Sequence, residues 1–235
     1  MSYSFENYWK SIYQKRINSS YEEQSIQSKA IINWHKKYIQ NIIAKEFRNY
    51  KPRVLDIGCC SGFLTNIFCN FSSEVIGVDY EKGFIEKAKL NYSNPKFFVG
   101  DIYNLNKIEG KFDLIVCFGV LQNISDLKSV LKNVKSKLRE TDKSKIIFTT
   151  INKYSIFNRK NLAKKITYSK NLEEFDLNFY DNETFKKFSK SSGLKLNNFK
   201  YLYVFPGFLA PISFIAKLFM PSSFSHHILI ELKHD

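Results

Sequence analysis

The chain alternates short apolar segments with helical segments from residue 53 to residue 151, and this alternation constrains its fold more than any other feature. Strands are predicted at 53–57, 74–78, 96–99, 113–118 and 145–151. Helices are predicted between them at 62–71, 82–91 and 124–138. Continuous apolar strands separated by helices are typical of a parallel sheet covered on both faces.

Both flanks of this core carry their own patterns. Residues 20–50 show an apolar stripe at three- and four-residue spacing, which predicts one long helix or two short ones ahead of the first strand, a candidate lid. After residue 151, Asp181 or Asn182 is a candidate N-cap for a helix that ends at Gly193. Two β-like stretches follow, at 194–205 and 226–233.

A chain of 235 residues suffices for one well-filled α/β domain and is short for two. Neither an internal repeat nor a low-complexity linker divides it. We therefore expect a single domain over 1–235. Its predicted parts are an N-terminal helical cap (1–50), a ligand-binding core (51–151), a basic insertion (152–179), and a C-terminal helix with strands (180–235).

The formal net charge of +14 favours contact with an anion such as a phosphate, a nucleic acid or an acidic membrane face. The excess is local as well as global. Residues 143–172 contain no Asp or Glu but hold eight basic residues: Lys143, Lys145, Lys153, Arg159, Lys160, Lys164, Lys165 and Lys170. A solvated loop and an anion-binding loop both fit this run.

The four cysteines, Cys59, Cys60, Cys69 and Cys117, form no CxxC pair, and no histidine is spaced around them as a metal ligand would be. We expect reduced thiols, no metal and a cytoplasmic protein. The largely apolar stretch 201–220 contains Pro206, Gly207, Pro211 and Lys217, which would break a straight spanning helix. No transmembrane span is predicted, although peripheral membrane contact stays open.

The most informative motif is Val54-Leu55-Asp56-Ile57-Gly58-Cys59-Cys60-Ser61-Gly62-Phe63-Leu64. A buried strand ends in an acidic residue, and a loop with two glycines leads into a helix. Such glycines let the backbone turn sharply and approach a ligand closely. Asp79 ends the next strand about 20 residues after Gly58, where a carboxylate can bind both hydroxyls of a ribose.

This loop differs from a dinucleotide fingerprint. A G-x-G-x-x-G loop leaves the helix N-terminus free for a pyrophosphate, whereas this chain has D-x-G-x-x-x-G. The carboxylate of Asp56 lies where a diphosphate would sit and suits a ligand with an ammonium group. A ribose and an ammonium without a phosphate point to S-adenosylmethionine.

The motif resembles the first motif of the class I S-adenosylmethionine-dependent methyltransferases, an acidic residue followed by G-x-G-x-G. Further segments match in order: Asp79, Gly100-Asp101-Ile102, and the strand Phe112–Phe118. Gly-Val-Leu-Gln-Asn-Ile at 119–124 resembles the V-L-H-H-I of the small-molecule branch. The resemblance implies a Rossmann-like methyltransferase fold. Its seven-stranded, mostly parallel sheet has helices on both faces and an antiparallel last strand, with an N-terminal helical lid.

The resemblance also implies the cofactor site. The loop should contact the methionine portion, Asp79 the ribose, and Asp101 with the backbone of Ile102 the adenine. The residues expected to bind S-adenosylmethionine, or its product S-adenosylhomocysteine, are Asp56, Gly58, Cys60, Gly62, Asp79, Tyr80, Asp101, Ile102 and Phe118. A purely structural role at the end of a strand fits Asp79 and Asp101 equally well. Cys60 replaces the middle glycine of the family motif, a departure that we expect to be tolerated.

The acceptor is less constrained. Methylation of a hydroxyl needs a base, and Gln122 stands where the small-molecule branch often has a histidine. Candidate catalytic residues are therefore His35, Gln122, His226 and Tyr21, each of which also fits a structural role. Candidate substrate-binding residues are Tyr13, Gln122, Arg159 and Lys160.

We expect O-methylation of a small acidic, phosphorylated, sugar-linked or lipid-like acceptor. The signatures of base-methylating enzymes are absent: Cys117-Phe118-Gly119-Val120 stands where they carry N/D-P-P-Y/F/W, and no proline precedes Cys117. We therefore expect no nucleic-acid partner. An RNA methyltransferase and a non-catalytic cofactor-binding scaffold remain the alternatives.

Overall fold

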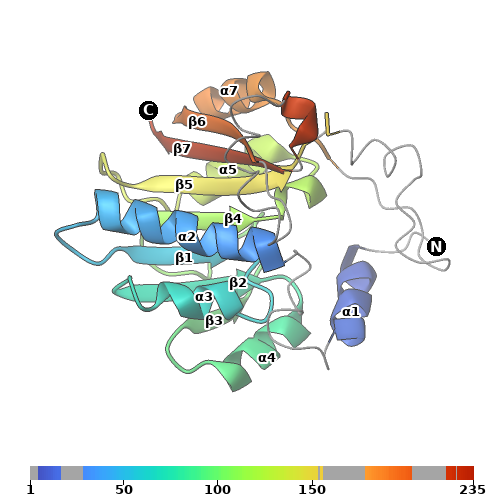
Figure 1. The fold of residues 1–235 in the computed structure, drawn as a ribbon. Coiled ribbons are helices and arrows are strands. Elements are labelled where there is room, and N and C mark those ends of the chain that lie inside the picture. The colour runs from blue at the N-terminus through green and yellow to red at the C-terminus, as the bar shows by residue number, and fades with distance from the viewer. Residues whose placement is uncertain (1–4, 17–28, 153, 156–177, 203–220, 226) are drawn as a thin grey trace.

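The computed structural model describes residues 5–16, 29–152, 154–155, 178–202, 221–225 and 227–235 (Figure 1). Its helices are α1 (Phe5–Arg16), α2 (Lys29–Glu46), α3 (Phe63–Phe68), α4 (Lys82–Asn91), α5 (Leu127–Lys135) and α7 (Asn182–Ser191), with short 3-10 turns η1 (Leu121–Asn123) and η3 (Ser222–Phe224). Its strands are β1 (Arg53–Ile57), β2 (Glu74–Asp79), β3 (Lys96–Val99), β4 (Leu114–Phe118), β5 (Lys145–Ile151), β6 (Leu194–Leu202) and β7 (His227–His234).

The seven strands form one sheet in the order β3-β2-β1-β4-β5-β7-β6. The first five run parallel to one another, and β7 is antiparallel to both β5 and β6. The predicted seven-stranded, mostly parallel sheet with an antiparallel last strand is therefore confirmed. The strand order reverses between β1 and β4, and ligands of open α/β sheets bind outside the carboxyl ends of the strands at such a point.

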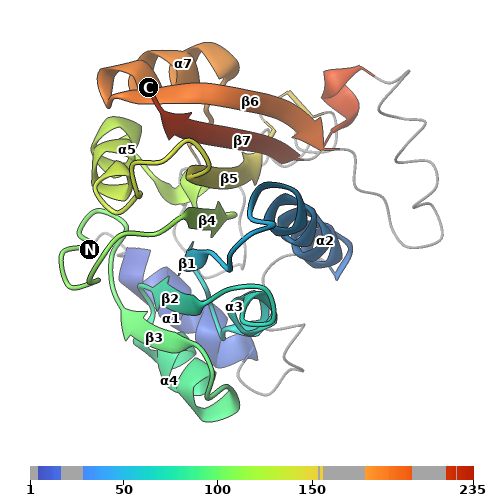
Figure 2. The same cartoon turned by 90° about the vertical axis from the view of Figure 1, so that its left-hand side faces the viewer.

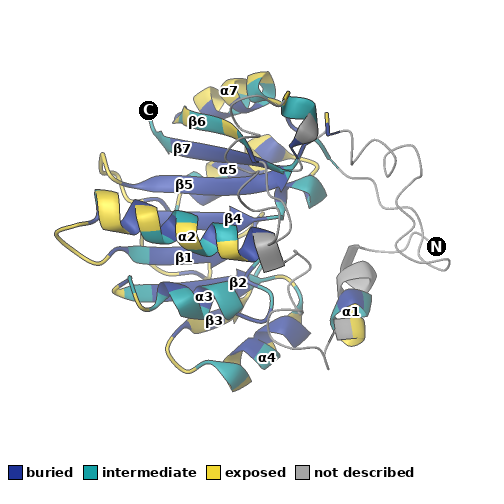
Figure 3. Cartoon of the chain, viewed as in Figure 1, coloured by how far each residue is buried: buried dark blue, intermediate teal, exposed yellow. Residues whose placement is uncertain are grey.

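Helices cover both faces of the sheet (Figure 2). On one face, Ile39 and Ile43 of α2 and Phe68 of α3 pack in one apolar cluster with side chains of β1, β2, β4, β5 and β7. On the other face, α5 and α7 pack against alternate side chains of the same strands. Figure 3 shows β1, β2, β4, β5 and β7 as mostly buried strands, whereas the edge strands β3 and β6 carry exposed residues.

The position of α2 corrects the expectation of a lid over 20–50. Ile31, Ile39, Ile42 and Ile43 belong to the buried core, so α2 is a structural layer of the sandwich. The other described helix of the predicted cap over 1–50 is α1, whose bounds the sequence analysis did not give. It lies near the carboxyl edge of the sheet beside α4, where the ring of Tyr13 meets Phe84 edge-on with centroids 5.3 Å apart (Figure 1).

The C-terminal helix has the predicted ends. The Asp181 side chain accepts a hydrogen bond from the backbone N–H of Thr184 at 2.8 Å, as an N-cap does. Gly193 has φ +66°, the left-handed conformation that commonly ends a helix.

Two sequence predictions lie largely outside the described residues: the basic insertion, of which 156–177 are not described, and the apolar stretch 201–220, of which 203–220 are not. Among the helices that are described, none is long and apolar enough to cross a membrane.

Candidate functional site

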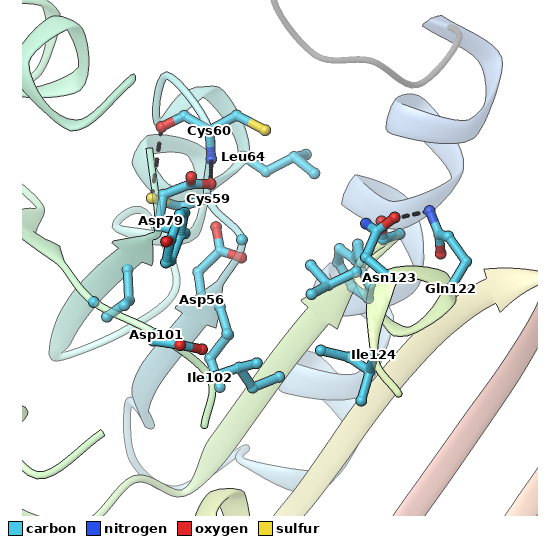
Figure 4. Close-up of a pocket in the computed structure, with 18 of the residues that line it drawn as sticks. Asp56, Cys59, Cys60, Leu64, Asp79, Asp101, Ile102, Gln122, Asn123 and Ile124 are labelled. Carbon is cyan, nitrogen blue, oxygen red and sulfur yellow. Dashed lines mark hydrogen bonds between the residues drawn. The ribbon is translucent and has the colours of Figure 1, made fainter. Parts of the chain in front are cut away.

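A cavity of about 690 Å³ opens at the carboxyl ends of β1, β2 and β4 (Figure 4). Its lining includes every residue that the sequence assigned to the cofactor except Gly62: Asp56, Gly58, Cys60, Asp79, Tyr80, Asp101, Ile102 and Phe118. Gly62 lies beneath this wall, where an added Cβ would come within 2.6 Å of the Phe97 ring. The strand order thus brings the predicted motifs to one place.

The loop after β1 is anchored on β2 by hydrogen bonds, and it turns at residues with left-handed backbone conformations. The backbone N–H groups of Gly58 and Cys59 both donate to the Val78 carbonyl, at 2.7 and 3.1 Å. Gly58 has φ +79° and Gly62 has φ +83°, conformations that glycine adopts at little cost. An added Cβ at Gly58 would lie 2.3 Å from a methyl group of Val120, so the two loops that border the cavity touch here.

Cys60 occupies a third left-handed position, with φ +48°, and among the described residues it is the one non-glycine with positive φ. Its N–H donates to Asp79 Oδ2 at 2.9 Å. The left-handed backbone explains why the family motif has a glycine at this position, where this chain carries a side chain. The sequence analysis predicted that the thiol would be tolerated but missed this strain, which costs roughly 1–2 kcal/mol.

Asp56 and Asp79 place two carboxylates on the cavity wall. Asp56 is 4% exposed, and its Oδ2 accepts a hydrogen bond from Thr65 Oγ1 at 2.7 Å. Asp79 accepts hydrogen bonds from the N–H groups of Cys60 and Glu81, both at 2.9 Å. Burial raises the pKa of Asp56 to about 7 and that of Asp79 to about 6, although these hydrogen bonds lower both in part.

The loop after β3 forms the next part of the wall. Asp101 Oδ1 accepts a hydrogen bond from the Tyr103 N–H at 2.9 Å, and the buried Ile102 side chain faces the cavity. The Tyr103 hydroxyl accepts hydrogen bonds from the N–H groups of Ser125 and Asp126, at 3.1 and 3.2 Å. Tyr103 therefore ties the loop after β3 to the loop before α5, a link that the sequence analysis missed.

The opposite wall comes from β4 and η1, and in Figure 4 Gln122, Asn123 and Ile124 face the carboxylates across the cavity. Gln122 Nε2 donates to the Gly119 carbonyl at 2.6 Å, and Gln122 Oε1 lies 3.4 Å from Thr150 Oγ1. Asn178 also lines the cavity, and its N–H donates to the Gln122 carbonyl at 2.7 Å. The amide of Gln122 is thus oriented by internal hydrogen bonds.

His35 does not line this cavity, which corrects its prediction as a base that reaches the acceptor. Its side chain is fully buried on α2, and its Nε2 lies 3.0 Å from Thr149 Oγ1. Its ring stacks on Phe118 with centroids 3.9 Å apart and an interplanar angle of 2°. Burial, with a smaller contribution from His227, lowers the pKa of His35 well below its usual range.

The remaining predicted residues separate into two groups. Tyr13 borders a second hollow beside α1 and α4, which shares Tyr80, Gly100 and Asp101 with the main cavity. The others lie outside the described residues: Tyr21, Arg159, Lys160 and His226. Their roles as catalytic or substrate-binding residues stay predictions.

The carboxylates of the cavity wall fit the predicted cofactor. A buried carboxylate with a raised pKa gains from a nearby positive charge, and no described lysine, arginine or histidine forms an ion pair with Asp56 or Asp79. A ligand with an ammonium and a sulfonium supplies such charges, and ribose hydroxyls supply donors for Asp79. Across the described residues there is no cluster of three or more potential metal ligands.

Curated relatives match about half of the chain. The Ubiquinone biosynthesis O-methyltransferase of Coxiella burnetii is 29% identical over 121 residues, 50% of this chain and 49% of that protein. The Malonyl-[acyl-carrier protein] O-methyltransferase of Bacillus anthracis is 28% identical over 136 residues, 53% of this chain and 48% of that protein. The chain therefore spans about half the length of these relatives.

The fold comparison covers nearly the whole chain. The magnesium protoporphyrin IX methyltransferase of Synechocystis PCC 6803, solved with bound SAH (S-adenosylhomocysteine), aligns with a TM-score of 0.60 over 97% of this chain and 93% of its own at 16% identity. That likeness confirms the predicted Rossmann-like methyltransferase fold. A family model described as a methyltransferase domain matches residues 49–201. The resemblance found in the sequence is confirmed, and the chain belongs to this family of methyltransferase domains.

Proposed function

We propose that this protein transfers a methyl group from S-adenosylmethionine to an oxygen atom of a small-molecule acceptor. The observation that carries the proposal is the pair of carboxylates, Asp56 and Asp79, on the wall of the 690 Å³ cavity. The two relatives described above support oxygen as the acceptor atom, because both are O-methyltransferases by name.

Bound S-adenosylmethionine supplies an electrophilic methyl carbon attached to a sulfonium. Asp79, already fixed by two backbone hydrogen bonds, would accept hydrogen bonds from the ribose hydroxyls. Asp56, held by Thr65, would offset the positive charge of the amino acid portion. Asp101 and the backbone of Ile102 would contact the adenine. None of these cofactor contacts moves a proton. A hydroxyl acceptor loses its proton as the methyl group is transferred, and the predicted bases left for that proton are Tyr21 and His226, which lie outside the described residues.

The wall around β4 and η1 would position the acceptor. Val120 and Ile124 are apolar, and Gln122 and Asn123 offer amide groups beside them. Such a wall excludes water and holds an acceptor oxygen in line with the methyl carbon, and positioning can contribute roughly 7–11 kcal/mol to a two-reactant step. The rate would therefore depend on the shape of this wall.

The charges of the lining favour a neutral acceptor over the acidic one expected from the sequence. In the described lining of the main cavity, the charged residues are Asp56, Asp79 and Asp101. No lysine, arginine or histidine stands in that described lining, so it offers an acidic acceptor no counter-charge. The cations invoked for an acidic acceptor, Arg159 and Lys160, lie outside the described residues. The same lack of a cation in the described lining argues against RNA, which otherwise fits the net charge of +14.

A direct test combines binding with methyl transfer. Calorimetry should give saturable binding of S-adenosylmethionine and S-adenosylhomocysteine and none of NAD. The full chain should then be incubated with methyl-labelled S-adenosylmethionine and each of three acceptor classes: catechols with and without an alkyl tail, a malonyl thioester, and total RNA.

We expect label in the catechols, which serve here only as probes of the neutral hydroxyl class. Label in the thioester would retain O-methylation and replace the neutral acceptor by an acidic one. Label in RNA alone would contradict the small-molecule proposal, and binding without transfer to any class would favour the scaffold alternative. NAD binding without S-adenosylmethionine binding would overturn the cofactor assignment. The Asp79→Ala variant serves as the background for label that does not depend on the site.

A further inference from the structure

A row of stacked aromatic rings leads from α2 to the cavity wall. Trp34 stacks on Tyr38 with centroids 4.7 Å apart, and its ring meets His35 edge-on at 5.6 Å. His35 in turn lies flat on Phe118 at 3.9 Å, and Phe118 lines the cavity. Offset-stacked and edge-to-face ring pairs with centroids about 4.5–7 Å apart contribute beyond the area that they bury, and the Trp34 pairs lie in that range. The His35–Phe118 pair is closer and parallel, so each ring restricts the tilt of the other.

His35 also reaches the neighbouring strand. Phe118 at the end of β4 is paired in register with Thr149 of β5, and His35 Nε2 lies 3.0 Å from Thr149 Oγ1. The N–H of Gly119 donates to the Thr149 carbonyl at 2.9 Å. One imidazole therefore contacts both strands at the point where β4 turns into the loop that carries Val120 and Gln122.

The second ring nitrogen of His35 makes histidine a costly choice for packing, because an apolar ring would bury no unpaired polar atom. His35 Nδ1 is buried and has no hydrogen-bond partner among the described residues. An unpaired buried polar atom costs stability, and buried backbone N–H groups without a partner are rarer than under-satisfied acceptors. The tautomer with its proton on Nε2, donating to Thr149 Oγ1, therefore fits the site best. Such a ring is neutral and packs against Phe118 without burying a charge.

We propose that His35 is a positioning residue that fixes the Phe118 ring in the cavity wall through their flat stack. The proposal rests on the proposed function, because it concerns the wall against which the cofactor and acceptor would bind. In this role His35 touches neither the acceptor nor the reacting atoms, and no proton passes through it. Its ring face is what matters, and the Thr149 hydrogen bond sets the orientation of that ring.

Three variants of the full chain separate this role from others. His35→Phe keeps a flat ring and loses the hydrogen bond. His35→Leu keeps apolar bulk and loses the ring. Ile39→Val is the matched control, because Ile39 is fully buried on the same helix and in the same cluster as Phe118. Each variant is measured by calorimetry with S-adenosylhomocysteine, by thermal unfolding, and by methyl transfer to the acceptor that the labelling test identifies.

We expect His35→Phe to bind S-adenosylhomocysteine within about twofold of the wild type, and His35→Leu to bind about three- to tenfold more weakly. Ile39→Val should lower the unfolding temperature and leave affinity unchanged. Equal losses in His35→Phe and His35→Leu would overturn the proposal, as would wild-type affinity in His35→Leu. Loss of methyl transfer in His35→Phe with intact binding would restore the base role and also overturn it.

The two proposals fail in different ways. A wild-type chain that binds neither S-adenosylmethionine nor S-adenosylhomocysteine contradicts the proposed function, whatever the variants do. A double-mutant cycle of His35→Leu and Phe118→Leu in thermal unfolding reports the stack without any ligand. Additive losses in that cycle would show that the two rings are not coupled and would overturn the inference alone.

Discussion

The two walls of the cavity are built in different ways. The wall proposed for the cofactor comes from three loops, each of which directly follows one of the strands β1, β2 and β3. Its side chains are carboxylates held by nearby hydrogen bonds, as Asp79 is by Cys60 and Glu81. The wall proposed for the acceptor comes from the end of β4 and from η1, with amide and apolar groups such as Gln122, Val120 and Ile124.

This difference explains why one wall is easier to interpret than the other. A carboxylate at a strand end acts through its own charge and its fixed place in the sheet. An apolar wall acts through shape, which depends on packing between distant segments such as α2 and β4. The chemistry of the cofactor can therefore be inferred from single residues, whereas the acceptor requires the complete wall.

The largest expected effect distinguishes the two walls by mutation. Asp79→Ala removes the proposed acceptor of the ribose hydroxyls, and hydrogen bonds to charged groups contribute about 1.5–3 kcal/mol. S-adenosylhomocysteine should bind roughly ten- to a hundredfold more weakly in calorimetry. Gln122→Ala should leave that affinity within about twofold and change the KM of the acceptor. Unchanged affinity in a folded Asp79→Ala variant would reduce Asp79 to a strand-end residue.

The fold was predictable where local pattern and packing agree. The predicted strands 53–57, 96–99 and 145–151 have the observed bounds, because each is a short apolar run between turns. The helix predicted over 124–138 is shorter, Leu127–Lys135, because the Asp126 side chain caps it by accepting from the Ser129 N–H. The bounds of α1 within the predicted cap over 1–50 were not given by the sequence, because its contacts with α4 are tertiary: the Tyr13 ring packs on Gly83 and Phe84.

The site was predictable to the same extent. The residues of the cofactor wall follow strand ends, so their order in the chain was enough to bring them together. His35 was predicted as a candidate base because histidine is the usual residue for that task. Only the packing of α2 on β4 and β5 places it behind Phe118, and no local pattern encodes a contact between segments so far apart in sequence. Tyr103 was missed for the same reason.

A second prediction concerns pH and again separates the walls. With pKa values of about 7 for Asp56 and about 6 for Asp79, both carboxylates lose charge as pH falls. A cationic ligand requires the ionised forms, so S-adenosylmethionine should bind roughly fifteenfold more weakly at about pH 6 than at about pH 7.5, with about eightfold from Asp56 and about twofold from Asp79. In the free protein, the effect of pH on folding stability has the opposite sign to its effect on ligand affinity. Both groups have raised pKa values in the folded chain, so their contribution is fully present below about pH 4 and is lost as pH rises through about 6–7.

Calorimetry across this pH range checks the binding, and thermal unfolding of the free protein checks the stability. Asp56→Asn is the control, because it removes the group with the higher pKa and keeps an acceptor for Thr65. Its binding should depend less on pH than that of the wild type. A wild-type affinity that is flat across this pH range would contradict the idea that the carboxylates attract a cation.

The smallest expected effect concerns the strained residue in the cofactor loop. Cys60→Gly relieves a left-handed conformation that costs roughly 1–2 kcal/mol, but glycine loses about 0.5–1 kcal/mol more conformational entropy on folding. The net change in the free energy of unfolding should be a gain of about 1 kcal/mol or less, measured by denaturant unfolding. Cys60→Ala keeps the Cβ and should give no gain. Equal gains in both variants would assign the effect to the thiol, and a loss in Cys60→Gly would mean that the Cys60 side chain stabilises the loop.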